Sequence, residues 1–342
     1  MNSAPFEMGP IRPVDEADSL LIRTTRGCPW NRCTFCDLYK DMKFSLRSVA
    51  EIKKDILAAK AYFNGHPFET CFLQDGDSFV MKTKDLIEIL KTLRTAFPSL
   101  KRISSYGRAQ TMVKKTLSDM QDICDAGLNK LYCGMESGSA QVLERVKKGI
   151  TPESIIRSAG MAGKAGMDVT QFIILGLGGQ TLSNTHAIET AKVLNQIDPD
   201  HIRVLTIGVK PGSELDRQMA AGEFILPSET QIIAEQRLLL ENLEGISSHY
   251  ANHHSVDLLL EIRGQLPEDK DRLIAILDRF LSLDDMDQIN FILGRRLGYY
   301  RRLSDMGNKL QYQIVEKQAQ KIRQTDPDSF EQIFHNLRIQ VI

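Results

Sequence analysis

The sequence predicts an α/β fold built on a parallel β-sheet, and the evidence is an alternation that runs through much of the chain. Six short runs rich in β-branched or aromatic residues are separated by amphipathic segments of helical period. Repeated strand–helix units form parallel sheets with right-handed crossovers. The length of 342 residues fits one barrel-sized domain with an appendage, or two modest domains. Periodicity alone allows both an open doubly wound sheet and an incomplete barrel.

Each predicted element is justified by its own residues. The six strands are expected at residues 20–24, 70–74, 102–106, 130–134, 169–175 and 201–207. One helical face is formed by Leu86, Ile89, Leu90 and Leu93. Gly127 and Gly166 each stand between a helical segment and a strand, where glycine ends a helix. Thr151 and Pro152 predict a helix start, with threonine as N-cap and proline at the first helical position. After residue 215 the alternation is expected to stop.

Composition and charge exclude several classes of protein. Hydrophobic residues make up 42% and charged residues 25%, as in ordinary globular proteins. Lys and Arg number 43 against 44 Asp and Glu, which disfavours a globally basic nucleic-acid binder. No apolar run approaches the roughly 20 residues of a membrane span, and the first residues lack an apolar secretory core. We therefore expect a cytoplasmic protein whose six cysteines stay reduced.

The most informative segment holds three cysteines directly after the first predicted strand. Four residues separate Cys28 from Cys33, and two separate Cys33 from Cys36. One loop of this kind can wrap its thiolates around a single centre of zinc, Cu(I) or iron and sulfur. A closed site takes four protein ligands, so three cysteines on a four-iron cluster leave one iron open for chemistry. The alternative is a structural zinc site completed by Asp37 or a distant histidine. The remaining cysteines, Cys71, Cys124 and Cys133, are expected in the core.

The cysteine loop and four later motifs, in this order, resemble the radical SAM superfamily, most closely its HemN/MiaB-like (Elp3/MiaB/NifB-type) branch. The later motifs lie at residues 74–78, 134–139, 173–181 and 210–215. Two departures stand out. Arg32 makes the first cysteine gap one residue longer than usual, a CX4CX2C loop, and Gln180 replaces a usual glutamate.

The resemblance implies a fold, cofactors and site residues. It implies a partial (β/α)6 TIM-like barrel at residues 19–220, preceded by an extension at 1–18 and followed by a mostly helical region at 221–342 that caps it. The implied cofactors are a [4Fe–4S] cluster held by Cys28, Cys33 and Cys36, and S-adenosylmethionine. Phe35 would lie on the adenine, and Arg108 would pair with the methionine carboxylate. The segment Asp75, Gly76 and Asp77 would meet the methionine ammonium through backbone carbonyls or a carboxylate. The other implied cofactor-binding residues are Glu136, Ser137 and Gly176.

The implied activity is reductive cleavage of S-adenosylmethionine to a 5′-deoxyadenosyl radical that abstracts hydrogen from a substrate. The electron donor would be a flavodoxin or ferredoxin. A haem-chaperone-like binding protein and a tRNA-modifying enzyme of the same superfamily are the alternatives. The motifs do not identify the substrate, which is expected to be either a small molecule or a macromolecule.

Two segments outside these motifs carry chemistry-bearing residues. His249, His253 and His254 are candidate catalytic residues or ligands, and the alternative is a polar hairpin or loop. Residues 295–302 mix arginine with tyrosine, which is typical of an RNA or acidic-substrate patch. The alternative there is a solvated helix face, and the neutral overall charge makes a nucleic-acid partner the less favoured expectation.

Overall fold

The computed structural model describes residues 4–326 and 329–341. The chain divides into two compact units, each described by itself below. The first comprises Met1–Met135 and Gly149–Gln171, and the second comprises Glu136–Lys148 and Phe172–Ile342. The division does not test the predicted boundary at residue 220, which stays a prediction.

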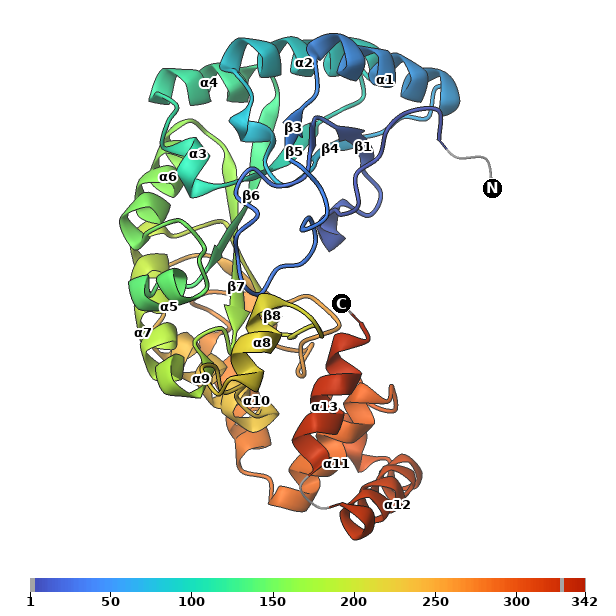
Figure 1. The fold of residues 1–342 in the computed structure, drawn as a ribbon, viewed down its shortest axis with the longest axis vertical. Helices are drawn as coiled ribbons and strands as arrows, with labels where there is room; N and C mark the ends of the chain where they lie inside the picture. Colours follow the sequence, from blue (N-terminus) through green and yellow to red (C-terminus); the bar gives the residue numbers. More distant parts are fainter. Residues whose placement is uncertain (1–3, 327–328, 342) are drawn as a thin grey trace. The chain divides into compact units, whose positions relative to one another are not determined.

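All six predicted strands are present, and the α/β prediction is confirmed (Figure 1). They are β1 (Leu20–Arg23), β4 (Thr70–Gln74), β5 (Arg102–Gly107), β6 (Leu128–Glu136), β7 (Asp168–Leu175) and β8 (His201–Thr206). With β9 (His249–Asn252) and β10 (Arg263–Gln265) they form one sheet in the order β1-β4-β5-β6-β7-β8-β9-β10. Neighbouring strands β1, β4, β5 and β6 run parallel, with Leu20 opposite Cys71 and Thr70 opposite Arg102.

In the first unit, helices cover the strands in series. They are α1 (Val49–Tyr62), α2 (Thr83–Ala96), α3 (Ala109–Met112), α4 (Leu117–Asp125) and α6 (Pro152–Lys164). Figure 1 shows α1, α2 and α4 side by side, and α2 contacts both of the others. The predicted face of Leu86, Ile89, Leu90 and Leu93 is completely buried there. Short elements η1 (Val14–Glu16), η2 (Ser78–Val80), β2 (Thr25–Arg26) and β3 (Ser45–Leu46) complete the unit, and antiparallel pairing of β2 with β3 brackets the cysteine loop.

The predicted turn chemistry is confirmed in the same unit. Gly127 and Gly166 have φ values of +119° and +82°, which an L side chain rarely adopts. Thr151 is the N-cap of α6 and accepts a hydrogen bond from the Ser154 N–H, and Pro152 is the first helical residue. These local signals fix where each crossover turns back toward the sheet.

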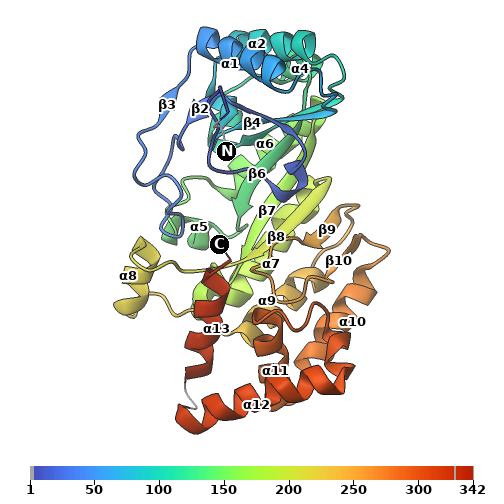
Figure 2. The ribbon, with the colours of Figure 1, turned by 90° about the vertical axis from the view of Figure 1, so that its right-hand side faces the viewer.

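The second unit adds strands where the sequence predicted none. Strand β9 pairs parallel with β8, His201 lying opposite His249, and β10 pairs antiparallel with β9 (Figure 2). The expectation that the alternation stops after residue 215 is therefore wrong. The reason is that β9 is a four-residue strand of mostly polar sequence, and it forms by burying Tyr250 and Ala251 beside β8.

The rest of this unit is helical, as predicted. Its elements are α5 (Ala140–Arg145), α7 (Gly179–Ile197), α8 (Glu214–Ala220), α9 (Glu229–Glu241), α10 (Lys270–Leu281), α11 (Asp285–Arg296), η3 (Leu303–Gly307), α12 (Lys309–Thr325) and α13 (Phe330–Ile339). Helix α9 packs on α7 and α10, and α11 packs on α12 and α13. Across the described residues, no helix has both the length and the apolar character needed to cross a membrane.

Candidate functional site

The cysteine loop lies between β2 and β3 and is fastened to itself. Cys33 is buried, Cys28 and Cys36 are half-buried, and all three are thiols. The Asn31 side-chain amide donates to the Tyr39 carbonyl at 2.6 Å, and the Lys40 ammonium donates to the Cys33 carbonyl at 3.1 Å. Within residues 4–326 and 329–341, no three His, Cys, Asp or Glu side chains are grouped closely enough to hold a metal ion. The structure thus places the three thiols on one loop without gathering them onto a point.

Asp75, the first residue after β4, anchors both ends of this loop. Its fully buried carboxylate accepts hydrogen bonds from the Arg23 guanidinium at 2.6 Å and the Gly27 N–H at 3.0 Å. It also accepts from the Tyr39 hydroxyl at 3.1 Å. Burial, with the Asp75 carboxylate alongside, raises the pKa of Tyr39, so this hydroxyl stays a donor. The carboxylate predicted to meet the methionine amine is therefore already engaged by the protein on either side of Cys28, Cys33 and Cys36.

The N-terminal segment contributes a second carboxylate that sequence reasoning missed. Glu7 pairs with Arg23 at 2.9 Å and with Arg26 at 2.6 Å, and lies 3.3 Å from Arg47. The hydrogen bond from Arg26 and the surrounding positive charges lower the pKa of Glu7. Glu7 thus joins Arg23 and Arg26, which precede the cysteine loop, to Arg47, which follows it.

Gly76 brings the backbone after β4 directly against the cysteine loop. A Cβ atom at this position would lie 3.2 Å from both the Cys28 Cα and the Gly27 carbonyl oxygen. A side chain at residue 76 would displace the backbone that carries Cys28, and the cofactor contact of Gly76 stays a prediction.

Asp77 and Arg108 lie on the same side of the first unit. Asp77 is fully buried and accepts hydrogen bonds from the Thr111 hydroxyl at 2.5 Å and the Phe79 N–H at 3.1 Å. Burial raises the pKa of Asp77 to about 6. Arg108 precedes α3, and its guanidinium carbon lies 6.0 Å from the centroid of the Trp30 ring in the cysteine loop. The arginine therefore faces the loop through an aromatic ring, at the outer limit of a cation–π contact.

The donor set and the surrounding polar atoms fit an iron–sulfur centre with an exchangeable position. Three thiols of one loop are the ligands that such clusters take. Gly76 lets the backbone after β4 approach Cys28 more closely than a side chain would allow. Thr34, between Cys33 and Phe35, has a buried hydroxyl with no hydrogen-bond partner among the described residues. Phe35 itself is half-buried, and its place on the adenine stays a prediction.

A substitution at Gly76 tests this approach. Gly76→Val is expected to lower the iron bound per chain after anaerobic reconstitution by about 10- to 100-fold, as for loss of an outer-shell partner of a metal site. The cause is a forced shift of the Gly27 and Cys28 backbone. Gly163→Ala, on α6 with no atom within 4 Å of the added Cβ, is the matched control and should load normally. Equal iron content in both variants would contradict the assignment.

The second unit holds the other predicted cofactor residues. Glu136 ends β6 in a left-handed conformation, with φ of +64°, and its carboxylate accepts a 2.6 Å hydrogen bond from Lys148. A non-glycine residue with positive φ is uncommon and clusters at functional sites. Ser137 lies 2.8 Å from Nδ1 of His186 on α7 and accepts from the Ser139 N–H. Lys148, the partner of Glu136, was missed as a site residue.

Gly176 serves the turn after β7. Its φ is +78°, its N–H donates to the buried Glu235 carboxylate at 2.7 Å, and a Cβ atom would lie 2.7 Å from Ile207. Burial raises the pKa of Glu235. The positive φ and the close approach of Ile207 explain why a glycine is needed at residue 176. The predicted contact of Gly176 with the cofactor stays a prediction.

The three candidate histidines fall at two ends of β9. His249 begins β9, with Nδ1 at 3.1 Å from the Arg203 guanidinium. His253 and His254 follow the carboxyl end of β9, and their N–H groups both donate to Asp257 at 3.1 Å. Burial lowers the pKa of His254, which favours its neutral form. Active sites of barrels lie at the carboxyl ends of strands, so the position favours His253 and His254 over His249.

The buried Asp257 is expected to make the free energy of unfolding depend on pH. Burial raises the pKa of Asp257 to about 7, against hydrogen bonds from His254, Thr206 and His253 that lower it. Because the folded protein keeps this proton to higher pH than the unfolded chain, the free energy of unfolding falls as pH rises from about 4 to about 7. In Asp257→Asn the free energy of unfolding should fall less steeply with pH than in wild type. Urea unfolding should show a difference between the two slopes of at most about 1.4 kcal/mol per pH unit. The exposed Asp271→Asn is the control and should follow wild type. If the free energy of unfolding of Asp257→Asn also changed with pH in parallel with wild type, the prediction would be wrong.

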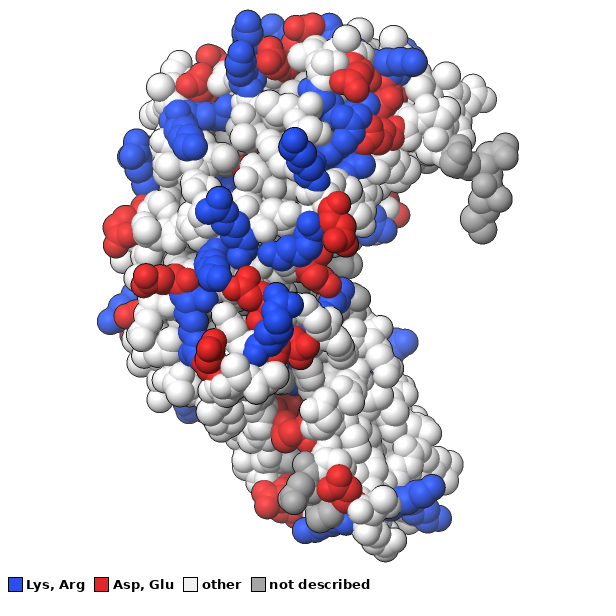
Figure 3. Space-filling model, in the orientation of Figure 1, with Lys and Arg blue, Asp and Glu red and all other residues white. Residues whose placement is uncertain are grey.

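The basic segment at residues 295–302 is only partly available to a partner. Arg296 forms a buried 2.7 Å ion pair with Glu229, and Arg295 donates to the Asp257 carbonyl at 3.2 Å. Arg301 and Arg302 are exposed. Figure 3 shows basic and acidic side chains interspersed over the visible face. The first two arginines therefore serve the fold, and a nucleic-acid role for the segment stays untested.

The predicted site residues thus fall into two sets. Cys28, Cys33, Cys36, Phe35, Asp75, Gly76, Asp77 and Arg108 belong to the first unit, and Glu136, Ser137, Gly176 and the histidines belong to the second.

The chain has relatives among known proteins. A curated relative from Pyrococcus horikoshii, an uncharacterized methyltransferase, is 26% identical over 235 residues, covering 66% of this chain and 48% of the relative. Bacteriochlorophyllide d C-8(2)-methyltransferase of Chlorobaculum tepidum is 30% identical over 143 residues, covering 40% of this chain and 30% of the relative. The chain thus spans less than half the length of either curated relative.

Structural comparison supports the fold. Coproporphyrinogen III oxidase of Escherichia coli aligns with a TM-score of 0.52 at 19% identity, over 66% of this chain and 52% of that chain. The model of the radical SAM superfamily matches residues 22–191, about half of the chain. That match contains the three-cysteine loop, the Asp75–Gly76 turn against it and the Glu136 segment. The barrel-like parallel sheet and the matched region agree, and the chain belongs to the radical SAM superfamily.

Proposed function

We propose that the chain is a radical SAM enzyme whose cysteine loop holds a [4Fe–4S] cluster. When bound, the cluster and S-adenosylmethionine supply reductive cleavage of the sulfonium to methionine and a 5′-deoxyadenosyl radical, which takes a hydrogen atom from the substrate. The observation that carries the proposal is the three-thiol loop, set against Gly76 and anchored on both sides by Asp75. The substrate is not identified by this arrangement.

The residues of the first unit would hold and shape the cofactor site. Cys28, Cys33 and Cys36 would be the metal ligands, and the protein would leave one iron without a side-chain ligand. Asp75 would fix the loop through Gly27 and Tyr39. Arg108 would present a planar fork suited to a carboxylate.

The residues of the second unit would contribute charge and, at the carboxyl end of β9, proton-transfer groups. Glu136, buried and paired with Lys148, would accept from hydroxyl or ammonium groups of the cofactor. His253 and His254 would be the candidates for a proton donor or acceptor near the substrate. A flavodoxin- or ferredoxin-type protein would supply the electron.

The test is an anaerobic assay of the full chain. After reconstitution with iron and sulfide, dithionite and S-adenosylmethionine are added, and 5′-deoxyadenosine and methionine are quantified by mass spectrometry. Formation of both, dependent on the reductant, supports the proposal. Zinc in the loop after oxygen-free purification, or a loaded cluster that never cleaves S-adenosylmethionine, would overturn it.

Methyl transfer is a second candidate, favoured by the methyltransferase name of the relative that covers 66% of this chain. S-Adenosylmethionine carrying a deuterated methyl group, supplied with fractionated cell extract, separates the two. Deuterium in a product other than methionine would indicate methyl transfer, whereas deuterium from a labelled substrate in 5′-deoxyadenosine would indicate hydrogen abstraction.

A further inference from the structure

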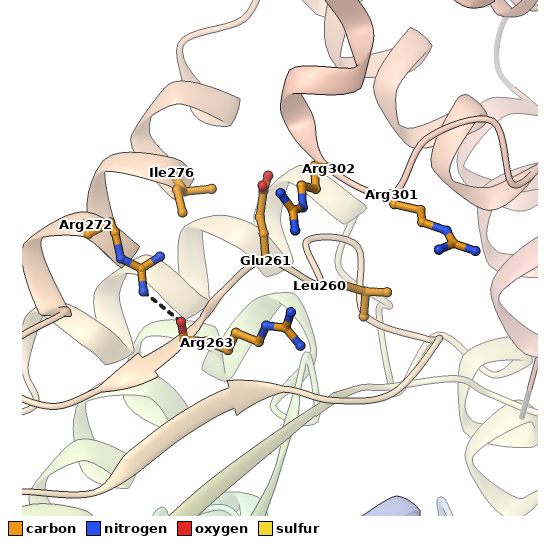
Figure 4. A pocket seen from close by; sticks show the side chains of 7 residues that line it. All are labelled: Leu260, Glu261, Arg263, Arg272, Ile276, Arg301 and Arg302. Carbon is orange, nitrogen blue, oxygen red and sulfur yellow. Dashed lines mark hydrogen bonds between the residues drawn. The ribbon is translucent and has the colours of Figure 1, made fainter.

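The second unit contains a cavity that the proposed function does not use. Its volume is about 550 Å³, and its lining includes Glu261, Arg263, Arg272, Ile276, Arg301 and Arg302 (Figure 4). They come from three segments: the start of β10 with the residues just before it, helix α10, and the stretch between α11 and η3. This volume lies in the range of small-molecule sites.

The lining carries an excess of positive charge. Four arginines and one glutamate leave three positive charges around the cavity. Figure 4 shows the Glu261 carboxylate beside Arg302, with Arg263 and Arg272 below and to the left and Arg301 pointing to the right. Within the part of the chain that the structure describes, no ion pair joins Arg263, Arg301 or Arg302 to a carboxylate. Like charges that line one cavity repel one another, and a bound anion would offset this repulsion.

The segments that carry the arginines are held in place. Arg272 donates from Nε to Asp269 at 2.9 Å and from Nη2 to the Arg263 carbonyl at 2.8 Å. The Asp305 carboxylate accepts the N–H groups of Arg301 and Arg302 at 2.8 and 2.9 Å. These contacts order the backbone around the cavity and leave guanidinium donors for a ligand, which lowers the entropic cost of binding.

The cavity lies beside the end of the sheet where ligands bind in α/β proteins. Arg263 is the first residue of the antiparallel strand β10 and pairs with Ala251, the third of the four residues of β9. It therefore stands near the carboxyl end of β9, which is parallel to β8. The carboxyl ends of parallel strands are the usual ligand edge of such sheets.

We propose that this cavity binds a small molecule through two phosphate groups. Each phosphate carries roughly 1.5 to 2 negative charges at neutral pH, so two of them match the three positive charges of the lining. The planar forks of Arg263 and Arg302 suit phosphate oxygens, and Ile276 offers an apolar wall to the rest of the ligand. A volume of about 550 Å³ is the size of a small-molecule site, so it favours a small molecule over an extended RNA. Binding here does not depend on the iron–sulfur chemistry and can fail independently of it.

The test is calorimetric titration of the full reconstituted chain with inorganic pyrophosphate. Wild type should bind it, and the double variant Arg263→Gln with Arg302→Gln should bind about 100-fold more weakly, at about tenfold for each charged hydrogen-bonding group. Arg279→Gln, an exposed arginine on α10 outside the cavity, is the matched control and should bind as wild type does. All three side chains are exposed, so the variants are expected to fold, which far-ultraviolet circular dichroism verifies.

Three results would overturn the proposal. Pyrophosphate affinity could be equal in the double variant and wild type. Citrate and sulfate could bind as tightly as pyrophosphate, which would indicate general anion screening. A single-stranded RNA could bind through the same arginines while pyrophosphate does not, which would assign the surface to nucleic acid. Reductive cleavage of S-adenosylmethionine is measured on the same preparations, so loss of the phosphate site and loss of the proposed function are distinguished.

Discussion

Cys28→Ala is expected to leave the chain with almost no iron after anaerobic reconstitution and with no 5′-deoxyadenosine formation. The loss should exceed the roughly 10- to 100-fold effect of removing an outer-shell partner of a metal site, because a ligand itself is lost. The structure explains why no neighbour can replace it. Gly27 is hydrogen-bonded to Asp75 and Gly76 packs on Cys28, so the loop cannot slide to present another group. Iron and sulfide content, with the visible absorbance of the cluster, provide the measurement.

The matched control is Cys124→Ala. Cys124 is a half-buried thiol of the same unit on α4, and its Sγ donates to the Gly166 carbonyl at 3.5 Å. This variant should load iron and cleave S-adenosylmethionine as wild type does. Full iron content in Cys28→Ala, or equal loss in both variants, would refute the assignment of the loop as the cluster site.

Asp75→Ala is expected to lower the free energy of unfolding by about 3–5 kcal/mol, the usual result of removing one partner of a buried ion pair. Arg23 would lose its 2.6 Å partner, and the Gly27 N–H and the Tyr39 hydroxyl would lose their acceptor. The cysteine loop would then be released at both ends, so iron loading should fall as well. Urea unfolding at neutral pH and the iron content of the refolded chain measure the two effects.

A control variant and a second variant at Asp75 test whether the buried charge causes the effect. Glu69→Ala removes an exposed carboxylate that pairs with Lys101 and should change the stability little. Asp75→Asn keeps an oxygen acceptor but loses the charge, so it should fall between alanine and wild type. If Asp75→Ala were as stable as wild type but failed to bind S-adenosylmethionine, the carboxylate would instead act on the methionine amine, as the family resemblance implies.

The strands that the sequence predicted well are those whose signal is local. β4 has the expected bounds, and β5 extends by one residue, because β-branched and aromatic residues stand between turn formers there. β9 was missed because its stability comes from pairing with β8, which is a property of residues nearly fifty positions away. Propensity in a four-residue polar segment carries no trace of such a partner.

The site residues that could be predicted are likewise those whose partners lie nearby in the sequence. The cysteine loop could be predicted because all of its ligands are adjacent in sequence. The Arg23–Asp75 pair could not, since 52 positions separate its members. A signal did exist: Arg23 is a charged residue inside a predicted buried strand, and such a residue needs a buried partner. Glu136 lies beyond the strand predicted at residues 130–134, so the same signal did not point to its partner Lys148.

The hydrogen bonds from Gly27 and Tyr39 to Asp75 have a consequence for the metal-free chain. They hold the loop by its two ends through protein contacts alone. Small metal domains that lack such contacts unfold when the metal leaves. Here a chain stripped of iron by air or a chelator should remain folded and ready for repair, so damage to its cofactor need not end in its degradation.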